Sequence, residues 1–160
     1  MRQESKPRFT LDHVGLVVSD LDEAVNFYVR AFEMQVALIE DDTYVDSVAI
    51  GIPDRPVRLR GATLSGGGAN IELHQYLTPS GAATREVFET GFGHIAFDVS
   101  DIEAAYEQLK DLGVQFNTLP QLIEHGTLTG RRWVYGKDPW GNVIELGQNP
   151  EEEKESREYA

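Results

Sequence analysis

Apolar positions along the chain follow two different periods. Val14–Val18 and Ile95–Val99 are short, continuous apolar runs with the length and composition typical of buried strands. After each run, apolar residues recur every three or four positions over 21–32 and 102–112, as they do on one face of a helix. Each half of the chain is therefore expected to begin with a strand that is followed by an amphipathic helix.

Polar residues mark the ends of these two helices. Ser19-Asp20 and Ser100-Asp101 stand directly before them, and such short side chains accept hydrogen bonds from the first free N–H groups of a helix. Gly113 follows the second helix, where glycine commonly takes the left-handed conformation that ends it. Glu33-Met34 follows the first helix and offers no such glycine.

Further strand-like segments follow each helix. They fall at residues 35–39, 57–65 and 69–77 in the first half and at 114–118, 131–136 and 142–147 in the second. The glycines at 66–68 and the segment KDPWGN at 137–142 read as turns between the last two strands of each half. The predicted order of elements in each half is βαβββ.

The two halves also repeat one another in sequence. The aligned pairs are His13 with His94, Asp20 with Asp101, and Glu72 with Glu145. The pattern G-x-x-I-E-L surrounds both glutamates. The interval from the aligned histidine to the aligned glutamate is eight residues longer in the first half, which indicates a diverged loop around 44–56.

This repeat predicts the organisation of the chain. The expected fold class is α+β, with two tandem βαβββ modules that form a curved mixed sheet around a shared metal cleft. The first module is placed at residues 9–80 and the second at 81–148. Residues 1–8 are expected to be a flexible N-terminus, and residues 149–160 a charged, solvated tail.

The composition narrows the classes of function. The 160-residue chain has a formal net charge of −13, so nucleic acid and anionic membranes are poor partners. No apolar run approaches the roughly 18 residues of a membrane span, and MRQESKPRF at the start lacks the apolar core of a secretory signal. The absence of cysteine excludes disulfides and cysteine-ligated metals, and it fits a cytoplasmic location.

Two histidines and two glutamates stand at matching places in the repeat. His13 and His94 begin the first strand of each half, and Glu72 and Glu145 lie in the last strand, turned away from their apolar neighbours. Equivalent residues of a duplicated fold converge near its symmetry axis, and this set suits one divalent ion: Zn, Ni, Co, Mn or Fe. Two octahedral positions would stay open for water or substrate. Duplication also copies structural residues, so a purely structural role is the alternative.

Three longer motifs resemble one family. DHVGLVVSDLDEAVNFY (12–28), GHIAFDVSDIEAAYEQLKDLGV (93–114) and DPWGNVIEL (138–146) resemble signatures of the vicinal-oxygen-chelate superfamily. That superfamily includes glyoxalase I, methylmalonyl-CoA epimerase, extradiol dioxygenases, and the fosfomycin and bleomycin resistance proteins. The resemblance covers about residues 9–148 and implies paired βαβββ modules and a homodimer.

The resemblance also implies a ligand set and a branch of the superfamily. The implied metal ligands are His13, Glu72, His94 and Glu145. This His/Glu/His/Glu set resembles that of bacterial-type glyoxalase I and favours the isomerase and lyase branch. Val17 and Tyr76 stand where glutathione-dependent members typically carry an arginine and an asparagine, so a glutathione hemithioacetal is not the expected substrate. A malonyl-type thioester, a 2-keto acid or a ketose-like ring, each with adjacent oxygens, is expected instead.

The expected reaction is proton abstraction next to a carbonyl, through a metal-bound enediolate. An isolated carboxylate is too weak a base for such a proton at neutral pH, and a cation that stabilises the enediolate lowers the barrier. We expect Glu145 to be the base and Glu72 to be its counterpart. Other carboxylates in the diverged region are alternatives for a second base: Glu40, Asp41, Asp42 and Asp46.

Four further residues are candidates for contact with substrate: His74, Tyr76, Trp133 and Arg60. His74 shares a face with Glu72 by alternation, and it could instead line only the mouth of the cleft. The aromatic residues, together with Tyr135, could wall the pocket or pack in a core or dimer contact. Arg60 could bind an anionic group of the substrate or simply pair with surface acids, and the same holds for Arg55, Arg58 and Arg131.

Two other functions remain open at this point. One is a binding or resistance protein of the same fold that sequesters a small metabolite; such members usually lack the metal ligands. The other is an extradiol-type dioxygenase, which usually has no carboxylate at the place of Glu72. Both are less consistent with the four candidate ligands than an isomerase or epimerase is.

Overall fold

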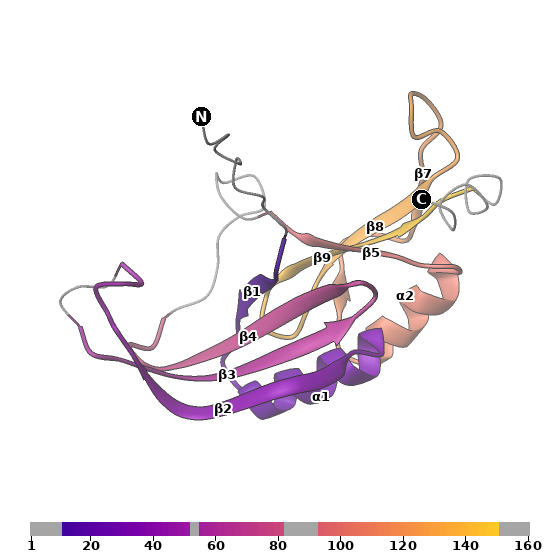
Figure 1. Ribbon diagram of the computed structural model, residues 1–160. Coiled ribbons are helices and arrows are strands. Elements are labelled where there is room, and N and C mark those ends of the chain that lie inside the picture. Colours follow the sequence, from indigo (N-terminus) through magenta and orange to yellow (C-terminus); the bar gives the residue numbers. More distant parts are fainter. Residues whose placement is uncertain (1–10, 52–54, 82–92, 151–160) are drawn as a thin grey trace, which may run out of the picture. The chain divides into compact units, whose positions relative to one another are not determined.

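The structure is a computed structural model that describes residues 11–51, 55–81 and 93–150 (Figure 1). The chain divides into two compact units, Met1–Pro79 and Ser80–Ala160, and each is treated by itself. Residues 1–8, predicted as a flexible N-terminus, and residues 151–160 of the predicted tail lie outside the described residues. No helix within the described ranges is long and apolar enough to cross a membrane.

The first unit has the predicted βαβββ order. Its elements are β1 (Val14–Val17), α1 (Leu21–Phe32), β2 (Gln35–Val45), β3 (Val57–Gly66) and β4 (Ala69–Thr78). The strands form a sheet in the order β1-β4-β3-β2, in which only β1 and β4 run parallel. Helix α1 packs against β3 and β4 (Figure 1), and Leu21, Tyr28, Leu64 and Leu73 are completely buried there. One face of this sheet is therefore covered by the helix.

The second unit repeats the arrangement with shorter strands. Its elements are β5 (Ile95–Asp98), α2 (Ile102–Asp111), β6 (Gln115–Phe116), β7 (Gln121–Leu122), β8 (Arg132–Lys137) and β9 (Val143–Gln148). The sheet order is β5-β9-β8-β6, and β7 also pairs with β8. Helix α2 packs against β9, where Ile102, Ile144 and Leu146 are buried. The two helices and two mixed sheets confirm the predicted α+β class.

The repeat extends to the register of the strands. In the first unit Val14 of β1 lies opposite Ile71 of β4, and in the second Ile95 of β5 lies opposite Ile144 of β9. Both pairs are parallel, and each begins one residue after the aligned histidine. The same sequence pattern therefore builds the same local geometry twice.

Both helices begin where the sequence predicts. The side chains of Asp20 and Asp101 accept hydrogen bonds from the backbone N–H groups of Glu23 and Ala104, each at 3.0 Å. Gly113, with φ of 99°, ends α2 in a Schellman motif, because its N–H and that of Val114 bond the carbonyls of Lys110 and Leu109. At the end of α1, Glu33 itself adopts the left-handed conformation that glycine would otherwise supply.

Some strand boundaries differ from the expectation. Strand β2 does not end at Ile39; it continues to Val45 through a bulge at which Asp42 has a φ of 54°. The strand expected at 114–118 is reduced to β6, and the short β7 follows Pro120, which has no N–H to donate to a ladder. The segment that carries the alternative bases Glu40, Asp41 and Asp42 is thus part of an edge strand.

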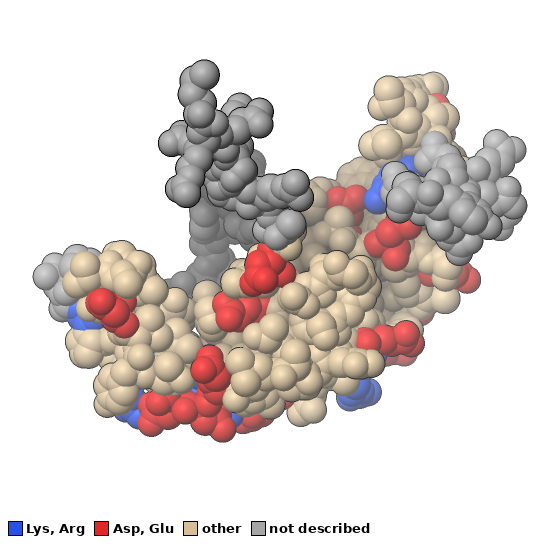
Figure 2. Space-filling model, viewed as in Figure 1, with Lys and Arg blue, Asp and Glu red and all other residues tan. Residues whose placement is uncertain are grey.

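Acidic side chains are the main charged groups on the visible surface. On the face shown in Figure 2, Asp and Glu are more widespread than Lys and Arg, as the net charge of −13 requires. An arginine or lysine on such a surface is attracted to nearby carboxylates, so the partners that it makes show which acids surround it.

Candidate metal and substrate site

Each unit brings its histidine and glutamate together. Nε2 of His13 lies 3.2 Å from Oε2 of Glu72, and Nε2 of His94 lies 3.2 Å from Oε2 of Glu145. Register explains both contacts, because each glutamate lies opposite a small residue, Gly15 or Ala96, and the histidine two positions earlier has room to reach it. Both pairs lie on the sheet face that the helix of the unit leaves uncovered. We call these faces the Glu72 face and the Glu145 face.

The geometry of each pair fits two neighbouring ligands of one ion. Nitrogen and oxygen ligands that each lie about 2.1 Å from a divalent metal, at a right angle, are separated by about 3 Å. The side chains stay reachable: His13 and Glu72 are 40% and 30% exposed, and His94 and Glu145 are 36% and 16% exposed. No group of three or more such side chains within the described ranges is arranged to hold a metal ion. That both histidine–glutamate pairs bind the same ion stays a prediction.

Asp12 orients His13, a role that sequence reasoning missed. The Nδ1–H of His13 donates to Oδ2 of Asp12 over 2.7 Å, which leaves Nε2 directed at Glu72. The hydrogen bond to Asp12, and then the charge of Glu72, raise the pKa of His13 above its usual value. Asn70 holds the main chain here, because its amide donates to the carbonyl of Asp12 over 3.2 Å. The sequence feature that could have revealed this role is the acidic residue directly before His13. The second half has Gly93 at the equivalent position.

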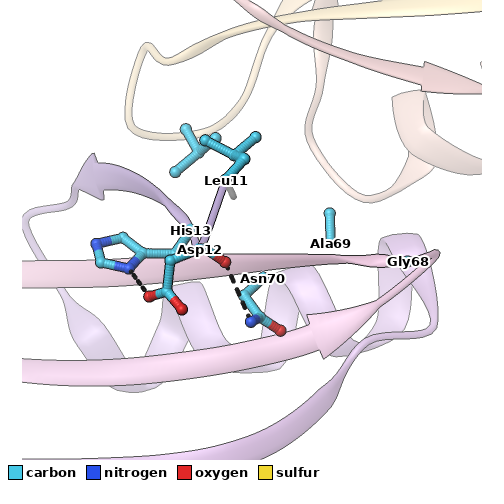
Figure 3. Close-up of a pocket in the computed structure, with 7 residues that line it drawn as sticks. Leu11, Asp12, His13, Gly68, Ala69 and Asn70 are labelled. Atoms are coloured by element: carbon cyan, nitrogen blue, oxygen red, sulfur yellow. Dashed lines mark hydrogen bonds and ion pairs between the residues drawn. The ribbon is translucent and has the colours of Figure 1, made fainter. Parts of the chain in front are cut away.

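These residues border a pocket beside the start of β1. Its volume is about 210 Å³. Figure 3 shows the imidazole of His13 and the carboxylate of Asp12 facing one another at this pocket, with the amide of Asn70 below them. The lining residues are Leu11, Asp12, His13, Val14, Gly68, Ala69 and Asn70. All of them belong to the first unit, so this unit alone forms a hollow of mixed polar and apolar lining next to one candidate ligand.

Two predicted substrate contacts lie on the Glu72 face. Nε2 of His74 lies 3.2 Å from Oε2 of Glu72, the same oxygen that faces His13. The ring of Tyr76 lies edge-on to that of His74, with 6.4 Å between their centroids. Gly61 stands opposite His74 in β3, and a Cβ atom at this position would lie at ordinary contact distance from the imidazole. The alternation along β4 therefore places these side chains as expected.

The Glu145 face carries two aromatic residues of β8. Tyr135 lies opposite Glu145, and its hydroxyl lies 3.4 Å from both ring nitrogens of His94. Burial raises the pKa of Tyr135, and a hydrogen bond to Glu145 raises it further, so the phenol stays protonated and donates to the carboxylate. Trp133, a predicted substrate contact, packs edge-on against Tyr135 at 5.5 Å between centroids.

The structure does not bring Arg60 to the Glu72 face. Its guanidinium binds both carboxylate oxygens of Asp22 at 2.9 Å and one oxygen of Asp41 at 2.8 Å. Asp22 lies in the first turn of α1, so Arg60 points to the helix-covered side of the sheet. These acids raise the pKa of the Arg60 guanidinium above its ordinary value. Arg60 thus pairs with acids, the alternative that the sequence left open.

Two of the alternative bases are also engaged in ion pairs. Asp41 binds Arg60, and Asp42 binds Arg58 through both oxygens. The hydrogen bond from Arg58 lowers the pKa of Asp42, which makes that carboxylate a weaker base. Of the carboxylates predicted as bases, Glu72 and Glu145 are the ones in contact with the candidate histidines.

Two glutamines with a clear structural role were also missed. Oε1 of Gln75 accepts the backbone N–H of Leu21 over 3.1 Å, and Oε1 of Gln148 accepts that of Ile102 over 2.8 Å. Each glutamine follows the candidate glutamate of its unit by three residues and binds the first residue of the helix. The signal was present as a longer repeat, I-E-L-x-Q, at 71–75 and 144–148.

Comparison with known proteins identifies a family. The profile of the Glyoxalase/Bleomycin resistance protein/Dioxygenase superfamily matches residues 10–146. This span contains both histidines and both glutamates of the candidate site.

Two curated relatives are similar over most of their length. A 2-epi-5-epi-valiolone epimerase from Actinomyces sp. is 33% identical over 144 residues, with 84% of this chain and 76% of the relative covered. A probable lactoylglutathione lyase from Vibrio parahaemolyticus is 32% identical over 139 residues, with coverage of 86% and 88%. Relatives with these names support an enzyme of the isomerase, epimerase or lyase type.

Solved structures share the fold. A glyoxalase family protein from Bacillus cereus superposes with a TM-score of 0.69 at 21% identity, over 93% of this chain and 98% of that one. A fosfomycin resistance protein from Listeria monocytogenes, crystallised with Mn(II) and sulfate, superposes with a TM-score of 0.59 at 20% identity, over 91% and 96%. At these identities the likeness shows the architecture.

Proposed function

Because the chain belongs to the Glyoxalase/Bleomycin resistance protein/Dioxygenase superfamily, we propose that it is a divalent-metal-dependent isomerase or epimerase. It removes a proton next to a carbonyl of a substrate with adjacent oxygens and returns it at the other face or the neighbouring carbon. The observation that carries the proposal is the pair of 3.2 Å histidine–glutamate contacts, which recur in the same register in both units.

Four side chains would hold the ion: His13, Glu72, His94 and Glu145. The chemistry of this donor set suits a borderline divalent metal, which would polarise the substrate carbonyl and stabilise negative charge on its oxygen. Relatives named as an epimerase and as a lyase support the same class of reaction. The manganese in the Listeria structure is the kind of ion that such a set accepts.

Glu145 acts as the base in this proposal. Its carboxylate is the least exposed of the four candidate ligands, and the protonated hydroxyl of Tyr135 donates to it. The contact with His94 and the position opposite Tyr135 place this carboxylate between a candidate ligand and a phenol, and a positioned carboxylate is what general-base catalysis requires. Glu72, held between His13 and His74, is the counterpart that returns the proton in an epimerisation.

The test combines metal analysis with exchange of solvent deuterium. Purified protein is expected to contain a divalent metal, and to catalyse deuterium entry at the carbon next to a carbonyl in malonyl-type thioesters, 2-keto acids or cyclic ketoses. Glu145→Gln should lower the exchange rate by about a hundredfold or more. Glu124→Gln, which removes an exposed carboxylate of the second unit, serves as the matched control.

Other outcomes would replace the proposal. Tight binding of a metabolite by metal-free protein, without exchange, would favour the sequestering protein. Oxygen uptake with a catechol would favour the dioxygenase. Full exchange activity in both Glu72→Gln and Glu145→Gln would remove the assigned base. A homodimer and a cytoplasmic location stay predictions, and sedimentation analysis checks the first.

A further inference from the structure

The repeat breaks at one position on the Glu145 face. The first half reads I-E-L-H-Q and the second I-E-L-G-Q, so Gly147 stands where His74 stands in the other unit. A Cβ atom on Gly147 would collide with Nη2 of Arg131 and would lie 2.7 Å from its Cζ. Because glycine has no Cβ atom, the space next to Gly147 is open, and the guanidinium of Arg131 fills it. Since Gly147 alternates with the buried Leu146, the guanidinium lies on the same face as Glu145.

Neighbouring side chains hold the guanidinium in place. Nη1 of Arg131 donates to Oδ1 of Asn149 over 2.5 Å and lies 3.5 Å from Oδ1 of Asp98. The side-chain amide of Asn149 also donates to Oδ1 of Asp98 over 3.1 Å. Asn149 is buried, with 4% exposure. The guanidinium is therefore ordered before any ligand arrives, which lowers the entropic cost of binding one.

The charge of Arg131 is matched less completely than that of Arg58 or Arg60. Arg58 and Arg60 each make short paired contacts with both oxygens of an aspartate, at 2.5–2.9 Å. Within the described ranges, the ion pair of Arg131 is a single 3.5 Å contact, and its short contact is with a neutral amide. The side chain is 18% exposed. On an acidic surface, this guanidinium retains an unmatched attraction for an anion.

We propose that Arg131 forms an anion subsite that receives a carboxylate or phosphate group of the substrate. This inference rests on the proposed function, because it places the anion beside Glu145. Arg131 lies against Gly147, two residues from Glu145 along β9, which corresponds to roughly 7 Å. Trp133, opposite Gly147, forms an apolar neighbour of the subsite. The substrate class is thus a carbonyl compound whose reacting carbon is separated by a few bonds from an anionic group.

Planar guanidinium groups recognise both kinds of anion in a two-point contact. Titration of metal-free protein with malonate and with inorganic phosphate, followed by calorimetry, separates the two. For the anion that the wild type binds more tightly, the affinity of Arg131→Gln is expected to be about tenfold lower. Arg131→Lys keeps the charge without the planar fork and should fall between the wild type and Arg131→Gln.

Two further variants sharpen the experiment. Arg132→Gln removes the same charge from the next residue, whose side chain pairs with Glu103 on the helix-covered side, and should bind anions as the wild type does. Gly147→Ala keeps the charge and displaces the guanidinium, so anion binding should weaken as it does in Arg131→Gln. Circular dichroism and thermal melting confirm that each variant is folded.

Unchanged anion affinity in Arg131→Gln would overturn the inference, and so would a wild type that binds neither anion. Both outcomes leave the proposed function standing, because the titration needs neither metal nor turnover. Conversely, deuterium exchange that fails while Arg131-dependent anion binding persists would reject the proposed reaction alone.

Discussion

At the scale of single residues, the candidate ligands differ in how they are supported. His13 is oriented by Asp12, whereas His94 lies against the phenol of Tyr135. Glu72 contacts a second histidine, His74, while Glu145 accepts from Tyr135. The two halves repeat the ligands but not their surroundings, so the two carboxylates are expected to have different roles.

Asp12 provides a direct test of this support. Asp12→Ala removes the acceptor that orients His13, and it should weaken metal binding by about tenfold or more, the usual effect of losing a partner of a metal-bound histidine. Asp12→Asn keeps an acceptor oxygen and should recover part of the loss. Calorimetric titration of metal into apo-protein measures both, with Glu124→Gln as the control. Equal affinity in Asp12→Ala and wild type would show that His13 needs no such partner.

At the scale of elements, glutamine side chains join the last strand of each unit to its helix. Gln148→Ala removes the acceptor for the N–H of Ile102 at the start of α2. The free energy of unfolding is expected to fall by about 1 kcal/mol, as for the loss of a helix cap. Urea denaturation measures the change. The matched control is Gln115→Ala, at an exposed position of β6, and equal losses in both variants would contradict a capping role.

Arg60 joins three elements of the first unit: α1 through Asp22, β2 through Asp41, and its own strand β3. The hydrogen bond from Arg60 lowers the pKa of Asp22 below the ordinary value of 3.8. A lowered pKa in the folded state contributes stability above the unfolded pKa, and this contribution is lost as the pH falls through the folded value. Acidification below pH 3.8 should therefore destabilise the wild type in part through this pair.

Arg60→Gln should be less stable near neutral pH and should lose less additional stability on acidification below that value. Thermal melting from near pH 7 to about pH 3 measures the dependence. Arg55→Gln, which changes an exposed arginine, is the control for net charge. Parallel pH profiles for Arg60→Gln and wild type would show that the pair contributes nothing to acid stability.

The elements were predicted to different degrees for physical reasons. Helix α1 matches its expected range because its apolar period and the cap at Asp20 are both local in sequence. The extension of β2 was missed because I-E-D-D-T-Y-V has no alternation; a bulge at Asp42 and pairing with β3 keep that segment in the sheet. The direction of Arg60 depends on pairing between strands, which the sequence of one strand does not contain.

The candidate site was predicted through the repeat. Alignment of the halves singled out both His–Glu pairs, and each pair meets within its own unit. The roles of Asp12, Gln75 and Gln148 were not predicted, because they depend on contacts between side chains and a neighbouring segment. Arg131 was noted only as one of several arginines, since nothing in its own segment reveals the space above Gly147.

At the scale of the whole molecule, the four candidate ligands come two from each unit. If they share one ion, the chain binds one metal, and neither half alone retains high affinity. His13→Ala and His94→Ala should therefore each lower the bound metal to a small fraction of the wild-type content. Plasma mass spectrometry of purified, dialysed protein measures it, and two ions per chain, or half the metal in each variant, would indicate separate sites.

The contrast between His74 and Gly147 has a consequence for how such a protein diversifies. Gln75 and Gln148 bind the first residue of the helix in both units, while the residue before each glutamine has changed from a large side chain to none. Variation at this one place changes which side chain stands beside the candidate carboxylate, an imidazole in the first unit and the guanidinium of Arg131 in the second, while the glutamine contact with the helix is kept. Duplicated halves can in this way acquire different chemistry without losing the contacts that hold each sheet to its helix.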